Sequence, residues 1–162
     1  LHLTDGSILS FPSRRFEKTP YVRLELLTAS NNIASYALFN DNYVYYWRPD
    51  DARTTKAKRG DFTPNNVQML LSYEEIAAFE NDKIVKCSLT TLNNKSVIYV
   101  ESLEPQMNYM RKYWISPING ILIKSETYKA NRLIYETNIT KFELSTVSDA
   151  NFRLPNGASI IS

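Results

Sequence analysis

The sequence contains few of the residues from which catalytic and metal-binding sites are usually built. Among its 162 residues are one histidine, one cysteine and four glycines. The histidine, His2, lies near the N-terminal end, where chains commonly fray, so we expect neither a histidine-based catalytic triad nor a multi-histidine metal site. With four glycines, a Gly-rich phosphate-binding loop is not expected either. The composition therefore disfavours triad hydrolases, metalloenzymes and nucleotide-binding enzymes.

The one cysteine, Cys87, rules out an internal disulfide and disfavours a cysteine-based metal site. Cys87 alternates with Val85 and Leu89, and this spacing places all three side chains on one side of a strand. A free cysteine behaves as a small apolar residue. We therefore expect Cys87 to be buried.

Long apolar runs and a dominant charge are also missing. No stretch approaches the ~18–20 apolar residues of a membrane-spanning helix. The formal net charge is +2 and charged residues make up 22% of the chain, which is typical of a solvated surface and not of a nucleic-acid-binding one. The chain begins with Leu1 and shows no signal segment, so we expect it to be a trimmed piece of a longer protein.

The sequence does have aromatic residues and the periodicity of strands. Aromatics make up 12% of the chain, with 11 tyrosines. Apolar and polar residues alternate in several segments, which predicts half-buried strands. These segments are 22–26, 33–39, 43–47, 85–89, 98–100, 107–115, 121–126 and a last strand that runs to about residue 144. Turns predicted at Asp41-Asn42 and Asn93-Asn94 join neighbouring strands.

Two more turns follow each other in the second half of the chain. Pro117 sets a bend, and Asn119-Gly120 is expected to supply the positive φ angles of a tight hairpin. Ala130-Asn131 then lies between two further strand segments. The pattern predicts a long antiparallel meander.

One segment has the period of a helix. Thr63-Pro64 suits a helix start, and Val67, Leu70 and Leu71 form an apolar stripe. A second short helix is expected from Ser72 because Ser-Tyr-Glu-Glu has the form of a capping box. The stretch before it, 52–61, reads as a polar loop. Its basic cluster, Lys56–Arg59, suits a solvated loop and, less well, a contact with a partner or an anionic surface.

A run of strands with one helical interruption predicts an α+β fold. We expect residues 1–162 to form one domain. It would be a single, strongly curved antiparallel sheet, a half-barrel, with the helices packed on its concave face.

The aromatic residues are the candidates for a functional surface. They fall on at least five predicted strands, so some must point away from the core. Ordinary core packing and cross-strand pairing explain most of them. The functional alternative is an apolar groove or an aromatic protein-binding face. The residues chosen for that role are Tyr45, Trp47, Tyr113, Trp114 and Tyr135.

The adjacent carboxylates do not form an obvious catalytic pair. In Asp50-Asp51 and Glu74-Glu75 the two side chains diverge, in a strand to opposite faces and in a helix by about 100°. We expect them to be solvated, with Glu75 in a capping role. A pair assembled from distant strands, as in glycosidases, would leave no mark in the sequence.

Several segments together resemble the lipoprotein-carrier superfamily, which includes LolA, LolB and RseB. The resemblance is carried by the early strand 18–25, by Tyr113-Trp114 followed by the Pro/Asn-Gly turn, by 121–126 (Ile-Leu-Ile-Lys-Ser-Glu) and by the closing 152–157 (Phe-Arg-Leu-Pro-Asn-Gly). It covers roughly residues 15–157. Within the superfamily, the Asn-, Ile-, Lys- and Tyr-rich composition is most similar to GerS-like spore-germination lipoproteins of clostridia.

This resemblance implies a role without catalysis. Such a lipoprotein would be extracytoplasmic, anchored by lipid at the inner spore membrane, and would need no cofactor. It would bind and activate an N-acetylmuramoyl-L-alanine amidase that modifies the spore cortex by forming muramic-δ-lactam. A strand-swapped homodimer is also implied. A lipid-bearing cysteine is absent because Cys87 is internal, so the anchor region would precede this sequence.

Two alternatives stay open. A carrier or sensor of lipid or lipoprotein acyl chains would need a continuous apolar cavity of several hundred Å³. An enzyme with dispersed carboxylates would need two of them facing each other across a cleft.

Overall fold

The computed structural model describes residues 1–59, 83–105 and 108–161. The predicted helices of 63–79 lie outside these ranges. Within the described ranges, a short 3-10 helix, η4, spans Asp149–Phe152. No helix among the described residues is both long and apolar enough to cross a bilayer.

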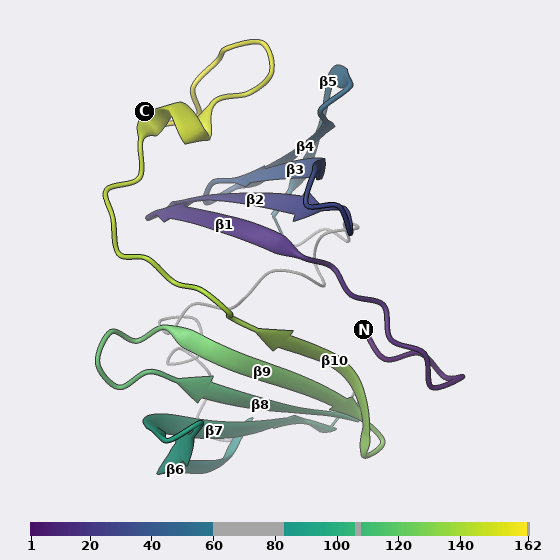
Figure 1. Cartoon of the computed structure of the whole chain (residues 1–162), viewed down its shortest axis with the longest axis vertical. Coiled ribbons are helices and arrows are strands. Elements are labelled where there is room, and N and C mark those ends of the chain that lie inside the picture. Colours follow the sequence, from purple (N-terminus) through teal and green to yellow (C-terminus); the bar gives the residue numbers. More distant parts are fainter. Residues whose placement is uncertain (60–82, 106–107, 162) are drawn as a thin grey trace. The chain divides into compact units, whose positions relative to one another are not determined.

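Ten strands form two five-stranded antiparallel sheets, where one sheet was expected (Figure 1). The first holds β1 (Ser13–Lys18), β2 (Tyr21–Leu27), β3 (Ile33–Phe39), β4 (Tyr43–Arg48) and β5 (Asp51–Lys58). The second holds β6 (Ile84–Leu92), β7 (Lys95–Glu104), β8 (Tyr109–Ile115), β9 (Leu122–Lys129) and β10 (Arg132–Asn138). Every pairing joins strands that follow each other in the chain, so each sheet is a simple meander.

The two sheets belong to two compact units. The β1–β5 unit comprises the described part of Ser10–Gln68 together with Leu144–Ser162, up to residue 161. The β6–β10 unit comprises Leu1–Leu9 and the described part of Met69–Glu143. A strand periodicity of two predicts strands but does not say where one hydrogen-bonded ladder stops and another begins, which is why the single sheet of the prediction was wrong.

The C-terminal segment covers one face of the first sheet. Phe152 in η4 is fully buried and packs with Leu38 and Trp47. Leu154 and Ile160 add partly buried apolar contacts to the same cluster. The Ser148 hydroxyl caps η4 by accepting a hydrogen bond from the Ala150 N–H at 3.3 Å. This face, which was expected to carry helices, is therefore closed by extended chain and one helical turn.

Strand β5 lies where a polar loop was predicted. Its residues pair with β4 in antiparallel register, for example Tyr43 opposite Lys58. β5 is an edge strand and is mostly exposed. An edge strand with little buried surface needs no apolar alternation, and charged side chains protect it from further pairing. The first three residues of the basic cluster Lys56–Arg59 therefore belong to strand β5. The Lys56 ammonium lies 3.6 Å from the centroid of the Tyr43 ring on the neighbouring strand.

The second sheet has a core cluster on one face, and a fully buried valine, Val97, on the side of β7 that also carries Tyr99. Val100, Tyr113, Ile115 and Leu122 are buried together in the core cluster. The predicted turn at Asn93-Asn94 is confirmed, with φ of 49° and 62°, as in a type I′ hairpin. The last strand ends at Asn138 and not near residue 144.

The turn around Gly120 is longer than predicted. Gly120 has a positive φ of 70°, but Asn119 does not. The Gly120 N–H donates to the Ser116 carbonyl at 2.9 Å, and the Ser116 N–H donates to the Ile121 carbonyl at 2.8 Å. The loop is therefore a four-residue connection and not a two-residue hairpin, and its wider span accommodates Pro117, which has no N–H to donate.

The prediction that Cys87 is buried is wrong. Cys87 is exposed, and its neighbours on the same side of the strand are exposed as well, Val85 by 49% and Leu89 by 72%. Alternation identifies the side of a strand on which apolar residues lie, but not whether anything packs there. β6 is an edge strand, so it has a neighbouring strand, β7, on one side only, and its side chains lie at the margin of the core.

The Ala130-Asn131 turn leads to a test of the fold. Both residues have positive φ, 48° for Ala130 and 63° for Asn131. The left-handed region costs an alanine roughly 1–2 kcal/mol, and glycine enters it freely. We expect Ala130→Gly to raise the free energy of unfolding by about 0.5–1 kcal/mol after the extra flexibility of the unfolded chain is counted. Urea unfolding measures this change.

Ala52→Gly is the matched control, because Ala52 is an exposed strand residue outside the positive-φ positions. It should lower the free energy of unfolding by roughly 0.5–1 kcal/mol. Equal losses from both substitutions would show that Ala130 is not strained.

Candidate binding face of the beta6 to beta10 sheet

The aromatics chosen from the sequence divide between the two units. Tyr45 and Trp47 lie on β4 within the cluster around Phe152, and Trp47 is only 9% exposed. Tyr113 is 3% exposed in the core of the second sheet. The register of β8, β9 and β10 places Tyr135 on the same face as Tyr113. Trp114, half-buried, points to the opposite face.

That opposite face carries ordered rows of cross-strand neighbours. Trp114 lies opposite Tyr99 of β7 and Lys124 of β9. The next row reads Lys86, Glu101, Lys112, Glu126 and Glu136 across β6 to β10. Tyr128 belongs to the row after that. We call the surface of Tyr99, Glu101, Lys112, Trp114, Lys124, Glu126, Tyr128 and Glu136 the aromatic-charged face.

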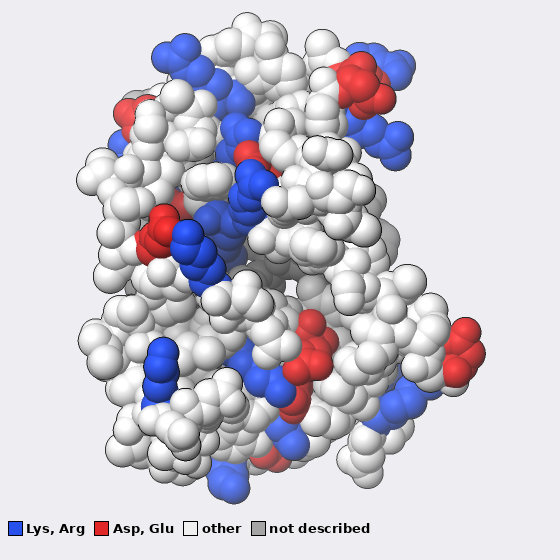
Figure 2. Space-filling model, viewed as in Figure 1, with Lys and Arg blue, Asp and Glu red and all other residues white. Residues whose placement is uncertain are grey.

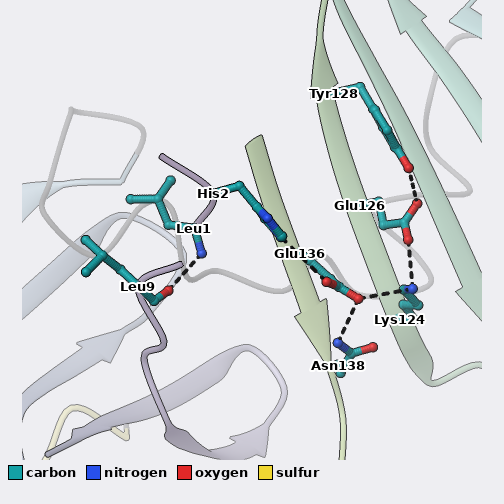
Figure 3. A network of polar contacts seen from close by, with 8 residues as sticks. All are labelled: Leu1, His2, Leu9, Lys124, Glu126, Tyr128, Glu136 and Asn138. Carbon is teal, nitrogen blue, oxygen red and sulfur yellow. Dashed lines mark hydrogen bonds and ion pairs between the residues drawn. The ribbon is translucent and has the colours of Figure 1, made fainter. Parts of the chain in front are cut away.

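Lys124 neutralises two carboxylates on this face (Figure 3). Glu126 and Glu136 are direct cross-strand neighbours, an arrangement that repels when both are charged. The Lys124 ammonium lies 2.7 Å from Glu126 Oε1 and 3.1 Å from Glu136 Oε1. The three side chains are 12–28% exposed, so their attraction is screened less than that of surface charges.

Tyrosine hydroxyls and an amide complete the network. The Tyr128 hydroxyl donates to Glu126 at 2.8 Å, and Asn138 donates to Glu136 at 3.0 Å. On the neighbouring strands the Tyr99 hydroxyl donates to Glu101 at 2.6 Å. The carboxylates are therefore held by defined hydrogen bonds, which fixes the pattern of charge.

A lysine lies over each aromatic ring of the face. The Nζ atom of Lys112 is 4.7 Å from the Tyr128 ring centroid, and that of Lys124 is 5.2 Å from the Trp114 ring. Lys86 lies 5.6 Å from the Tyr99 ring. The Tyr99 and Trp114 rings are in contact, with their centroids 5.2 Å apart and a tilt of 58°. These cation–π contacts order long lysine side chains that would otherwise be mobile.

The pKa shifts follow from these contacts. Hydrogen bonds from Asn138 and Lys124 lower the pKa of Glu136. The bond to Glu126 raises the pKa of Lys124, burial lowers it by less, and the bond to Glu136 adds a smaller increase. Burial and the bond to Glu101 raise the pKa of Tyr99, and the bond to Glu126 raises that of Tyr128. Every shift favours the form that is already charged or bonded at neutral pH, which suits recognition better than proton transfer.

The N-terminal segment lies beside this face at the β10 edge (Figure 3). The His2 N–H donates to the Ile134 carbonyl at 2.9 Å, and the His2 ring nitrogen Nε2 lies 3.7 Å from Glu136. Residues His2 and Ile8 form an isolated antiparallel bridge. Among the described residues, no group of three or more His, Cys, Asp or Glu side chains is placed to hold a metal ion.

Of the five aromatics chosen from the sequence, Trp114 lies on this face, and none of the charged members of the face was chosen. Lys112, Lys124 and Glu126 were visible as polar positions between apolar ones. Their pairing depends on which strands are neighbours and in what register, and alternation along one strand carries no such information. The sequence signal is the occurrence of Lys and Glu at positions that alternate with the apolar residues of β7, β8 and β9.

Comparisons with known proteins place the chain only distantly. No family model matches the sequence, and no curated protein matches it. Three solved structures show a weak likeness. A domain of an outer membrane lipoprotein-sorting protein from Vibrio parahaemolyticus is 14% identical, with a TM-score of 0.41, over 83% of this chain and 63% of the other. A DUF1329 family protein from Desulfovibrio piger is also 14% identical, with a TM-score of 0.41, over 81% and 62%.

The third is a LolA superfamily protein from Nitrosomonas europaea, 13% identical with a TM-score of 0.32 over 77% of this chain and 58% of the other. The chain thus spans less than two thirds of each of these proteins. With TM-scores below 0.5, these three similarities are too weak to assign the chain to a family.

Replacing Lys124 tests the network. Lys124→Met would leave Glu126 and Glu136 opposed without a cation, and we expect the free energy of unfolding at pH 7 to fall by roughly 1–2 kcal/mol. The pKa of Glu136 is lowered in the folded state, so its contribution is present above the ordinary value of 4.5 and is lost as the pH falls below it. Stability of the variant should therefore vary less between pH 5 and pH 3, as urea unfolding across pH would show.

Lys141→Met serves as the control, because the Lys141–Glu143 pair is highly exposed, at 81% and 64%. It should leave both the stability and its pH profile nearly unchanged. If Lys124→Met behaves in the same way as this control, the network is not a stabilising feature.

Proposed function

We propose that this chain is the binding domain of an extracytoplasmic, lipid-anchored protein that has no catalytic activity of its own. Its partner would be a protein, an N-acetylmuramoyl-L-alanine amidase that modifies the spore cortex, and the chain would activate that enzyme. The resemblance to GerS-like spore-germination lipoproteins motivates the choice of partner. The aromatic-charged face is the observation that supports binding of a protein.

The aromatic residues of this face suit a protein interface. Interfaces are enriched in Tyr and Trp, and alternating fixed charges select a complementary partner surface. The half-buried rings of Tyr99, Trp114 and Tyr128 are held by neighbouring lysines, so binding would cost little side-chain entropy. Because the carboxylates already have partners within the sheet, the face would present a preformed pattern of charge.

Activation would follow from selective binding. A protein that binds the active, metal-loaded conformation of an enzyme more tightly than other conformations increases the population of that conformation. No chemical group of this chain needs to reach the substrate of the enzyme. The lipid anchor would restrict the complex to the membrane surface.

A charge swap tests the face. Glu101 and Lys112 are direct cross-strand neighbours. The double variant Glu101→Lys/Lys112→Glu keeps these two charges opposite each other, but it places like charges opposite Lys86 and Glu126 and removes the Tyr99–Glu101 hydrogen bond. We therefore expect a folded protein of reduced stability. We also expect a loss of amidase binding of tenfold or more, measured by calorimetry, together with loss of activation and of zinc retention by the amidase.

Lys95→Glu provides the comparison, because Lys95 is exposed beside the β6–β7 turn, six positions along β7 from Glu101. This variant should bind as the wild type does. If the wild-type chain changes neither the activity nor the zinc content of the amidase, the proposed function is wrong. If the swapped variant is folded and binds normally, the partner uses another surface.

A carrier of acyl chains is the second candidate, favoured by one apolar hollow. Leu103, Met110, Tyr109 and Tyr128 contribute to a hollow of about 310 Å³ at one end of the β6–β10 sheet. This volume lies at the lower limit for small-molecule sites. Mass spectrometry of the purified protein would favour the carrier if lipid were bound in stoichiometric amount, and the protein-binding proposal if it were not.

We also propose that a second copy of the chain pairs along β6. This edge strand is nine residues long, is mostly exposed, and shows Val85 and Leu89 to solvent. A long apolar edge with few charges is a template for adding another strand. The residues of β5, by contrast, include charged side chains that hinder such pairing.

Leu89→Lys should prevent this association, because a charged side chain on an edge strand blocks edge-to-edge pairing. We expect the wild-type chain to sediment as a dimer at tens of micromolar and the variant as a monomer. Leu144→Lys, which changes an 81% exposed leucine outside the strands, should stay dimeric. A monomeric wild type at these concentrations would contradict the proposal.

A further inference from the structure

The β1–β5 unit contains an open hollow of about 550 Å³ whose walls carry three arginines. Arg23, Tyr36 and Trp47 come from β2, β3 and β4, and Arg48 ends β4. Arg153 and Leu154, which directly follow η4, close the other side. We call this feature the arginine hollow. Figure 2 shows basic side chains gathered along this unit with acidic ones beside them.

The side chains of three adjacent strands stack within the hollow. The Arg23 guanidinium lies 4.6 Å from the centroid of the Tyr36 ring. The Tyr36 and Trp47 rings are nearly parallel, with centroids 5.0 Å apart and an angle of 18° between them. Tyr36 and Trp47 are cross-strand neighbours, so the register of the sheet fixes the stack. The guanidinium is thereby held in one orientation.

Arg23 is further fixed by hydrogen bonds that leave part of it unused. Its Nε and Nη2 donate to Glu25 at 3.0 and 2.8 Å, and Nη1 donates to the Asn151 carbonyl at 3.0 Å. Arginine has five N–H groups, so these three bonds leave two. Both Arg23 and Glu25 are nearly buried, with side chains 16% and 6% exposed. The hollow thus contains a preorganised donor of hydrogen bonds.

The charges around the hollow leave a positive excess. Glu25 offsets Arg23, and Asp51 is held by Arg53 at 2.8–3.0 Å. The hydrogen bonds from Arg53 lower the pKa of Asp51 to about 2, so Asp51 stays ionised and paired. The remaining charged residues of the lining are Arg48, Arg153 and Asp50, which carry two positive charges and one negative charge.

Arg48 and Arg153 are exposed and available to a ligand. Within the described part of the chain, neither has an ion-pair partner within 4.0 Å. The hollow therefore holds two exposed guanidinium groups and one that is fixed by hydrogen bonds. Planar guanidinium forks match the oxygens of carboxylates and phosphates in two parallel hydrogen bonds.

We propose that the arginine hollow binds a small organic anion, a carboxylate or phosphate group joined to a sugar-sized ring. The oxyanion would lie between Arg48 and Arg153 and accept from the unused N–H groups of Arg23. The edge of Trp47 and the apolar side chains of Leu154 and Pro155 would contact the ring. The volume of the hollow is within the range for small-molecule sites and exceeds what a bare inorganic anion needs.

The chain holds two tryptophans, one in each unit, and this gives a direct readout. Trp47 lies at the hollow and Trp114 lies on the β6–β10 sheet. In an NMR titration the indole N–H signal of Trp47 therefore reports binding at the hollow, and that of Trp114 serves as an internal reference. The probes are glucuronate, glucose 6-phosphate, inorganic phosphate and glucose. We expect glucuronate or glucose 6-phosphate to shift the Trp47 signal saturably at millimolar concentration, and glucose to leave it unchanged.

Arg48→Gln and Arg153→Gln test the arginines. Both residues are exposed, so the fold should be kept, and each substitution should weaken binding of the acidic sugar about tenfold or more. Arg132→Gln, an exposed arginine of the other unit, should bind as the wild type does. Added salt should weaken binding because the contacts are ionic.

Each probe decides one part of the proposal. Stronger binding of glucuronate identifies a carboxylate ligand, and stronger binding of glucose 6-phosphate identifies a phosphate ligand. Inorganic phosphate that binds as tightly as the acidic sugars overturns the role of the ring. Binding of neutral glucose with equal strength, unchanged binding by both arginine variants, or no shift with either acidic sugar overturns the site itself. None of these outcomes bears on the amidase, which the proposed function assigns to a different face.

Discussion

A single ammonium group holds together the polar surface of the second sheet. The antiparallel register places Glu126 opposite Glu136, and Lys124 lies within hydrogen-bonding distance of both. The same lysine lies over Trp114, while the two carboxylates bind Tyr128 and Asn138. The positions of the aromatic rings and of the charges on this face are therefore interdependent. Side chains that share several contacts have less rotamer freedom left to lose, and low loss of freedom on binding favours recognition surfaces in general.

The first sheet uses the same physical device for another purpose. Arg23 bridges the Glu25 carboxylate and the Tyr36 ring, as Lys124 bridges two carboxylates and a tryptophan. Here, however, the C-terminal segment closes over the sheet and supplies both Phe152 to the core and the Asn151 carbonyl to Arg23. The result is a hollow flanked by two more arginines and not an open face. The two units therefore differ in their polar features, an exposed pattern of rings and charges in one and a basic hollow in the other.

Much of the local structure was predictable because it depends on neighbouring residues. The strands around Leu24, Tyr36 and Tyr45, and the turn at Asn93-Asn94, follow from alternation and from the tolerance of Asn for positive φ. Trp114 was one of the five aromatics chosen from the sequence, and the structure places it on the aromatic-charged face. Tyr113, one residue away, was chosen together with it, although adjacent strand residues face opposite sides and only one of the two could lie outside the core. Cys87 shows the reverse error, an apolar position that was expected to be buried and is exposed on an edge strand.

The sequence by itself determined the strand character of the described chain, most of its turns, and its shortage of histidine, cysteine and glycine, because these depend on residue type and on contacts within a few positions. Only the tertiary structure decided that the strands form two ladders, which side of each strand is packed, and which lysine meets which carboxylate. Those features arise from contacts between residues distant in sequence, such as Arg23 with Asn151, and from a register in which a shift of one residue would exchange the two faces of a sheet.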